Sequence, residues 1–150
     1  NAFAPCTAEA VMQLCKHFEI PLTGKEVCII GRSLVVGKPL AILMLNQNAT
    51  VTVCHSKTEN IKEVCKRADV LVAAIGRAKA IGSSYCKEGA TVIDVGINVD
   101  EEGNLCGDVD FDTMKTVADK LTPVPGGLGL VTTAVLAQHL VRAYRLLEEK

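Results

Sequence analysis

The chain has 150 residues, of which 49% are hydrophobic and 3% aromatic, and its 16 basic and 17 acidic residues give a net charge of -1. This length suits one domain, the balanced charge gives no attraction to nucleic acid or to an anionic membrane, and no apolar run approaches the ~20 residues of a membrane-spanning helix. The sequence also shows no basic segment followed by an apolar one, as an export signal would, so we expect a cytoplasmic protein.

Hydrophobic periodicity predicts alternating helices and strands along the first two-thirds of the chain. An amphipathic helix is expected after Pro5, with Thr7 as its N-cap and apolar residues at helical spacing up to Phe18. Strands are expected at 25–30, 49–54, 70–75 and 91–95, and further helices after Gly37 and at 59–68. This alternation predicts an α/β fold, a Rossmann-type doubly wound parallel sheet with helices on both faces.

The pattern changes after Ile97. We expect a hairpin with its tip at 100–104, a short helix at 111–119, a brief strand at 120–122 and a long last helix from about Val131 to Glu148. The loop at 123–129 holds two prolines, which stiffen the backbone, and three glycines, which let another molecule come close to it. It either lines a binding site or only turns the chain into the last helix.

The segment 26–41 combines an apolar, β-branched run, a loop that begins at Gly31, and an apolar helix-forming segment. The unpaired N–H groups and the dipole at such a helix start suit a phosphate. The dinucleotide fingerprint G-x-G-x-x-G is incomplete, because Ser33 and Val36 occupy its later glycine positions. The spacing from Gly31 to Gly37 is one residue too long for a Walker loop. A plain strand-to-helix turn remains the alternative.

Polar residues follow the second expected strand, at the edge of the sheet where open α/β folds bind ligands. An NAD enzyme places Asp or Glu there to hold the ribose 2′-hydroxyl, whereas this chain has His55, Ser56 and Lys57, with Arg32 on the neighbouring loop. These groups would bind a 2′-phosphate through charge-assisted hydrogen bonds, and a carboxylate would repel it. The cluster favours NADP over NAD, and a solvated polar turn is the alternative.

No catalytic residue is predicted, since neither paired carboxylates nor a Ser/His/Asp arrangement stands out. Asp94 and Asp108 are expected to accept structural hydrogen bonds. The seven cysteines lack C-x-x-C spacing and are expected to be small buried residues in a reducing cytosol. No metal site is predicted, because Cys54-His55 is the only close Cys/His pair and adjacent residues rarely reach one metal.

Six short motifs occur along the chain, at 5–7, 31–39, 49–56, 94–98, 107–109 and 122–127. In this order they resemble the bifunctional methylenetetrahydrofolate dehydrogenase/methenyltetrahydrofolate cyclohydrolase family, over nearly the whole sequence. Each motif is weak alone, but the set is specific. A serine at the position of Ser33 is what this family carries, which accounts for the missing fingerprint glycine.

The resemblance implies that residues 1–150 form an NADP-binding domain, the C-terminal half of a longer enzyme whose N-terminal folate-binding and catalytic domain lies outside this sequence. It implies NADP-dependent oxidation of 5,10-methylenetetrahydrofolate to 5,10-methenyltetrahydrofolate. Hydrolysis to 10-formyltetrahydrofolate would follow in the full-length enzyme. The implied partners are the tetrahydrofolate substrate, the N-terminal domain and a second copy in a homodimer.

Two sets of site residues follow from the motifs and the resemblance. The cofactor-binding set is Thr7, Gly31, Arg32, Ser33, His55, Ser56, Ile97 and Thr132. The substrate-binding set is Pro125, Gly126, Gly127, Leu128 and Gly129. In the first set, Arg32 and Ser56 would hold the 2′-phosphate and Ile97 would meet the nicotinamide.

Two other hypotheses stay open on the sequence. The chain is either the cofactor domain of another two-domain NADP dehydrogenase, acting on shikimate-like acids, or a nucleotide-binding module without catalysis. The Pro125-Gly126-Gly127 stretch argues against the first of these.

Overall fold

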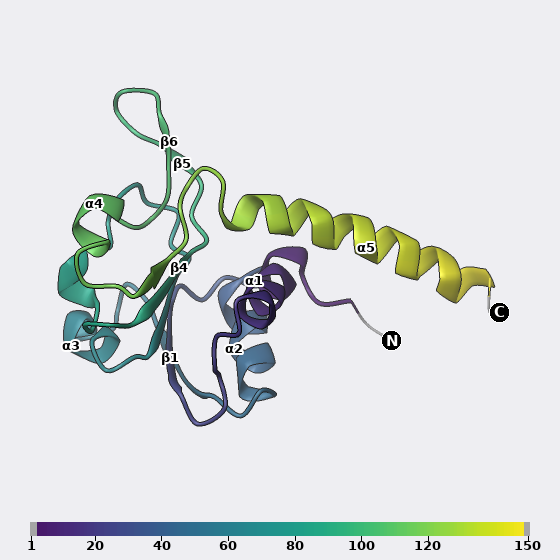
Figure 1. Cartoon of the computed structure of the whole chain (residues 1–150), viewed down its shortest axis with the longest axis horizontal. Coiled ribbons are helices and arrows are strands. Elements are labelled where there is room, and N and C mark those ends of the chain that lie inside the picture. The colour runs from purple at the N-terminus through teal and green to yellow at the C-terminus, as the bar shows by residue number, and fades with distance from the viewer. Residues whose placement is uncertain (1–2, 149–150) are drawn as a thin grey trace.

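A parallel sheet lies between two layers of helices in the computed structural model, which describes residues 3–148 (Figure 1). The sheet order is β2-β1-β3-β4-β7, and every neighbouring pair is parallel. Its strands are β1 (Glu26–Ile30), β2 (Thr50–Cys54), β3 (Val70–Ala73), β4 (Thr91–Asp94) and β7 (Lys120–Leu121). A separate antiparallel hairpin pairs β5 (Asn98–Val99) with β6 (Leu105–Cys106). The predicted doubly wound α/β fold is confirmed.

The helices divide between the two faces of the sheet. Their bounds are α1 (Cys6–His17), α2 (Gly37–Leu45), α3 (Ile61–Cys65), the 3-10 helix η1 (Ser83–Tyr85), α4 (Phe111–Met114) and α5 (Leu128–Glu148). α1, α2 and the first turns of α5 cover one face, and α3 and α4 cover the other. The rest of α5 extends beyond the other layers (Figure 1). Within residues 3–148, no helix combines the length and the hydropathy needed to cross a bilayer.

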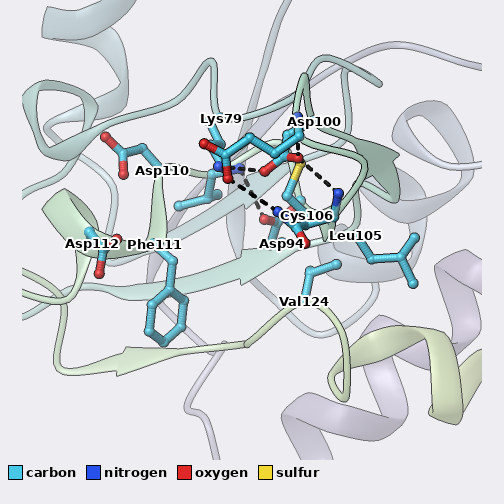
Figure 2. A pocket seen from close by; sticks show the side chains of 13 residues that line it. Lys79, Asp94, Asp100, Leu105, Cys106, Asp110, Phe111, Asp112 and Val124 are labelled. Carbon is cyan, nitrogen blue, oxygen red and sulfur yellow. Dashed lines mark hydrogen bonds and ion pairs between the residues drawn. The ribbon is translucent and has the colours of Figure 1, made fainter.

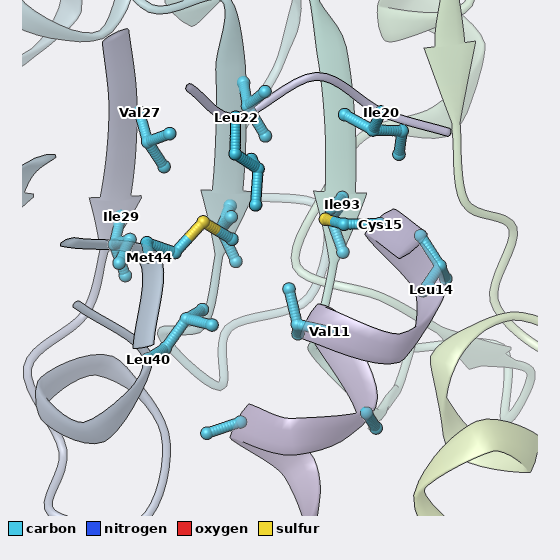
Figure 3. Close-up of a cluster of buried hydrophobic side chains, with 14 of the residues drawn as sticks. Val11, Leu14, Cys15, Ile20, Leu22, Val27, Ile29, Leu40, Met44 and Ile93 are labelled. Carbon is cyan, nitrogen blue, oxygen red and sulfur yellow. The ribbon is translucent and has the colours of Figure 1, made fainter. Parts of the chain in front are cut away.

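The central strands are buried on both faces, because successive side chains of a strand point to opposite sides. Val27 and Ile29 of β1 pack under α1 and α2, whereas Cys28 and Ile30 pack under α3 and α4. Figure 3 shows the first of these cores, with side chains from α1 and α2 meeting the sheet. This alternation explains why the sequence of each central strand is a continuous apolar run.

The strand order reverses at β1. The chain leaves β1 through α2 and reaches β2 on one side, and it then crosses through α3 to β3 on the other side. In open α/β sheets such a reversal opens a crevice beyond the carboxyl ends of the strands, where ligands bind. The loops after β1 and β2 therefore border the expected ligand crevice.

The sequence-predicted boundaries of four helices are wrong. The N-cap of α1 is Pro5 and forms no side-chain cap bond, so Thr7 lies inside the helix. The helices predicted at 59–68 and 111–119 end at Cys65 and Met114, because hydrogen-bonded turns lead the chain into the next strand soon after each of them. α5 begins at Leu128, three residues before the predicted start, where that side chain is buried against the sheet.

Candidate functional site

The loop after β1 depends on two glycines that no larger residue can replace without movement. Gly31 has φ of +126°, and a Cβ there would lie 2.1 Å from the carbonyl oxygen of Ala74. A Cβ at Gly37, the first residue of α2, would lie 2.1 Å from the carbonyl oxygen of Gly31. The Val36 N–H donates to Ser33 Oγ at 3.1 Å, which holds the loop at the helix start. Because Gly31 and Gly37 have no side chains, other atoms can come close to the backbone at the start of α2.

The loop after β2 lies beside it. The Gly31 N–H donates to the Cys54 carbonyl at 2.8 Å, so the residues that follow the two strands are neighbours. The His55 N–H donates to Thr58 Oγ1 at 2.9 Å, and the Lys57 N–H donates to His55 Nδ1 at 3.2 Å. Because Nδ1 accepts this bond, the ring proton of a neutral His55 resides on Nε2. The turn at 55–58 is therefore held by its own hydrogen bonds.

This pair of loops carries a free cationic group. Arg32, Ser33 and Ser56 are exposed and His55 is half-buried. Arg32 forms no ion pair within the part of the chain that the structure describes. The structure thus brings five of the predicted cofactor-binding residues together, with the Arg32 guanidinium and the hydroxyl groups open to an anionic ligand.

A second group of predicted residues surrounds a cavity of about 190 Å³ beyond β4. Ile97 and the segment 123–130 line it, and a Cβ at Gly129 would lie 3.5 Å from Ile97 Cδ1. The side chain of Ile97 is exposed, whereas that of Leu128 belongs to the hydrophobic core. Ile97 and the predicted substrate loop are therefore in one place, and Leu128 has only its main chain to offer there.

The buried carboxylate of Asp94, at the end of β4, organises the loops around this cavity. Its Oδ1 accepts the N–H groups of Gly96 at 2.9 Å and Asp108 at 3.0 Å, and its Oδ2 accepts the Val109 N–H at 2.9 Å. Burial raises the pKa of Asp94, against these three N–H donors, which favour the carboxylate form. A Cβ at Gly107 would lie 1.8 Å from Asp94 Oδ2, so that glycine is a steric requirement of the bond network.

Asp108 is the second buried carboxylate of this network. It accepts the backbone N–H groups of Ile75 at 2.6 Å, Gly76 at 3.0 Å and Arg77 at 2.8 Å, and the Asn98 side-chain amide at 2.9 Å. It therefore ties the loop after β3 to the chain that leaves β4. The expectation that Asp94 and Asp108 accept structural hydrogen bonds is confirmed.

The two predicted threonines lie on helices. Thr132 Oγ1 donates to the Leu128 carbonyl at 3.1 Å within α5. Thr7 lies in the first turn of α1, and within residues 3–148 its hydroxyl forms no hydrogen bond with another described residue. α1 and α5 are joined through His139, whose Nε2 lies 2.8 Å from Glu9 Oε2. The structure therefore places both threonines on the helical layer formed by α1 and α5.

A different pocket of about 500 Å³ lies between the hairpin and α4 (Figure 2). Asp100, Asp110 and Asp112 line it, and Lys79 Nζ lies 2.9 Å from Asp100 Oδ2. This lysine holds the pKa of Asp100 below its usual range. None of the predicted site residues lines the pocket, and its carboxylates would repel a phosphate.

Sequence reasoning missed the way in which the two carboxylates act together. The signal was present, because Asp94-Val95-Gly96 and Gly107-Asp108 are two short Asp/Gly motifs, each of whose glycines makes room for the other motif's carboxylate. A Cβ at Gly96 would lie 2.3 Å from Asp108 Oδ1. Two separate motifs are thus one structural unit.

The sheet, its reversal at β1 and the glycine loop that leads into α2 define a nucleotide-binding domain of the Rossmann class. Residues 5–148 match the model of one family, the NAD(P)-binding domain of tetrahydrofolate dehydrogenase/cyclohydrolase. The chain belongs to this family, as the motifs predicted.

Three comparisons show how similar the chain is to known proteins. The bifunctional protein FolD of Carboxydothermus hydrogenoformans is 58% identical over 149 residues, which are 98% of this chain and 52% of that protein. The crystal structure of FolD from Campylobacter jejuni superposes with a TM-score of 0.94 at 43% identity, covering 97% of this chain and 51% of the other. FolD from Trypanosoma brucei, crystallised with NADP and an inhibitor, gives 0.91 at 37%, covering 99% and 52%. The chain thus spans about half the length of these relatives.

Proposed function

We propose that this chain is the NADP-binding half of an enzyme that oxidises 5,10-methylenetetrahydrofolate to 5,10-methenyltetrahydrofolate. The whole enzyme would then hydrolyse the product to 10-formyltetrahydrofolate. The observation that carries the choice of cofactor is the Gly31–Cys54 hydrogen bond of 2.8 Å, which sets Arg32 beside the turn of His55 and Ser56. No carboxylate occupies the end of β2, where an NAD enzyme has one. The relative from Trypanosoma brucei, crystallised with NADP, supports the same choice.

The described residues fit a dinucleotide at this edge. Gly31 has no side chain to keep a phosphate away from the backbone, and the start of α2 adds the favourable end of a helix dipole. Arg32 and Ser56 would hold the 2′-phosphate, and Ser33 would lie against the pyrophosphate. His55 would add an N–H donor from Nε2. The residues present are therefore donors and cations, which a bound dinucleotide phosphate requires.

The cavity beyond β4 would receive the reacting ends of cofactor and folate. NADP, when bound, supplies the hydride acceptor. Ile97 and the glycine loop would line the contact between the two rings with apolar and main-chain atoms, which excludes water from the transfer. The Asp94–Asp108 network would hold this lining in place by fixing the loops that carry it.

The residues that activate the folate would come from an N-terminal half that this sequence does not contain. Along α5, Leu140, Tyr144 and Leu147 are between 61% and 71% exposed, a run of apolar surface that suits a covering domain. We also propose a homodimer, which the unpaired outer edge of β2 supports. A cytoplasmic location is supported by the seven free cysteines.

Titration calorimetry with NADP and NAD tests the cofactor assignment. We expect the chain to bind NADP more tightly than NAD, and Arg32→Ala to weaken NADP binding about 30-fold, which corresponds to the loss of ~2 kcal/mol of charge-assisted hydrogen bonding. NAD binding should change little. Arg145→Ala, which removes an exposed arginine on α5, is the charge-matched control and should leave both affinities unchanged. Equal effects of Arg32→Ala on NADP and NAD would refute the proposed 2′-phosphate contact.

The division of labour between the two halves can be tested separately. The 150-residue chain should bind NADP without oxidising 5,10-methylenetetrahydrofolate, because the activating residues lie outside it. The increase in NADPH absorbance measures this oxidation directly. Measurable oxidation by this chain alone would contradict the proposed division.

A further inference from the structure

Three cysteine sulfurs lie close together in the hydrophobic core on the face of the sheet that α3 covers. Cys28 Sγ lies 3.6 Å from Cys54 Sγ and 3.6 Å from Cys65 Sγ, and all three sulfurs lie within 4.8 Å of one another. All three residues are buried, with at most 1% of each exposed. Among residues 3–148, no other group of three or more histidine, cysteine or acidic side chains gathers in this way.

The fold, and not the spacing in the sequence, creates this cluster. Cys28 is opposite Thr52 in the register of β1 and β2, so Cys54 lies two residues further along the neighbouring strand and on the same face. Cys65 reaches the two strands from the last residue of α3. The three ligands therefore come from three rigid elements whose positions the core already determines, which makes a preformed site.

The distances match those of a thiolate site. With metal–sulfur bonds of about 2.3 Å, two sulfurs on one three-coordinate metal lie ~4.0 Å apart, and the three sulfur separations, two of 3.6 Å and a third of at most 4.8 Å, lie on either side of this value. Soft sulfur ligands favour Cu(I) and zinc among the ions of cells. A structural zinc site takes four ligands, and neither a fourth cysteine nor a histidine or carboxylate joins these three in the described part of the chain. Three sulfurs suit a three-coordinate Cu(I).

We propose that Cys28, Cys54 and Cys65 form a binding site for one Cu(I) ion. This differs from the sequence-based expectation of no metal site, which considered only residues close together along the chain. The site is separate from the proposed NADP contacts, although Cys54 directly precedes His55. Its test reads out copper and does not depend on the cofactor assignment.

Binding must release protons. Burial, together with the neighbouring Cys28, raises the pKa of Cys54 to about 11. The hydrogen bond to Cys65 and burial raise the pKa of Cys28 far above its usual range. Each thiol that becomes a ligand gives its proton to solvent. Copper enters and stays as Cu(I), so no electron is transferred.

The experiment titrates the reduced 150-residue chain with Cu(I) under anaerobic conditions, in competition with a bicinchoninate chelator. We expect one copper per chain, retained through gel filtration. Cys65→Ala should abolish this binding. Cys15→Ala is the matched control, because Cys15 is also buried but lies outside the cluster, and it should keep one copper.

Two further measurements keep the test decisive if a variant is destabilised. Circular dichroism establishes that Cys65→Ala is folded, and X-ray absorption of the copper-loaded wild type counts the sulfur ligands without any mutation. Three sulfur neighbours are expected. A two-sulfur copper, a wild type that retains no copper, or equal copper loss in Cys15→Ala and Cys65→Ala would overturn the proposal.

Discussion

The two ends of the proposed cofactor site are built in different ways. At the phosphate end, Arg32 and Ser56 are exposed side chains on short loops, and the loops are held by backbone hydrogen bonds such as that from Gly31 to Cys54. At the nicotinamide end, the loops are held by two buried carboxylates, Asp94 and Asp108, which accept seven hydrogen bonds between them.

This difference separates binding from stability. An exposed side chain can change without exposing a buried polar group, so substitutions at the phosphate end should alter affinity and selectivity and leave the free energy of unfolding nearly unchanged. Removing a buried carboxylate that accepts several N–H groups lowers the free energy of unfolding, because each of these buried donors then lacks an acceptor. The nicotinamide end therefore gains precise loop placement from the same groups that stabilise the fold.

The largest effect is expected for Asp108→Ala. Three backbone N–H groups and the Asn98 amide lose their acceptor, and at ~1–3 kcal/mol for each buried donor that stays unpaired, the free energy of unfolding should fall by about 4 kcal/mol. Urea unfolding measures this fall in the free energy of unfolding. Asp110→Ala removes only the N-cap of α4 and should cost about 1 kcal/mol. Similar losses in the two variants would show that the buried network is not what holds these loops.

Gly31→Ala tests whether the phosphate end has a rigid point of its own. The new Cβ would meet the Ala74 carbonyl oxygen at 2.1 Å in a backbone conformation with φ of +126°, so we expect a loss of about 3 kcal/mol. Gly24→Ala is the control, because Gly24 also has positive φ but no atom within 4 Å of a Cβ, and it should cost ~1 kcal/mol. Equal thermal shifts in the two variants would mean that the loop yields to the clash.

Ser56→Ala should sharpen the contrast from the other side. Loss of one hydrogen bond to the 2′-phosphate should weaken NADP binding about tenfold, or ~1.4 kcal/mol, with the unfolding midpoint unchanged. Ser84→Ala, at another exposed serine, should alter neither quantity. Calorimetry and thermal unfolding of both variants provide the comparison, and a large stability loss in Ser56→Ala would contradict the separation of the two roles.

The smallest effect is expected for Asp69, which directly precedes β3 at the side of the sheet where the strands begin. Asp69 accepts the Glu26 N–H at 3.0 Å and pairs with Lys87 at 2.6 Å, and these contacts hold its pKa below the usual range. A lowered pKa stabilises the fold above the ordinary value of 3.8, and this contribution is lost as the pH falls through the folded-state pKa.

Asp69→Asn should therefore cost about 1 kcal/mol or less at pH 7, and the difference from wild type should shrink as the pH falls below about 4. Denaturant unfolding at pH 7 and at a pH below about 4 measures this difference in the free energy of unfolding. Asp119→Asn, which disrupts only an exposed pair with Lys120, is the control and should show little difference at either pH. A cost for Asp69→Asn that is the same at both pH values would indicate lost packing and not lost charge.

The sequence by itself determined the class of fold and the family. Continuous apolar, β-branched runs such as Val70–Ala73 are suited to a strand buried on both faces, and their alternation with helical segments leaves few topologies open. The motifs also located both loops of the proposed site. Where prediction failed, at the last residues of α3 and α4 and the first residue of α5, local propensity was not decisive. Hydrogen-bonded turns end α3 and α4, and burial of Leu128 against the sheet sets the start of α5.

Only the tertiary structure decided which distant residues become partners. Asp94 and Asp108 are fourteen positions apart, and their two Asp/Gly motifs do not by themselves show that the carboxylates share one network. Cys28, Cys54 and Cys65 lie on three different elements, so their grouping has no recognisable spacing in the sequence. Helix and strand periodicity reports which face of an element is buried, and it carries no information on what lies opposite that face. Contacts across the core arise from the packing of whole elements. The tertiary structure therefore determines both the Asp94–Asp108 hydrogen bonds and the grouping of the three cysteines.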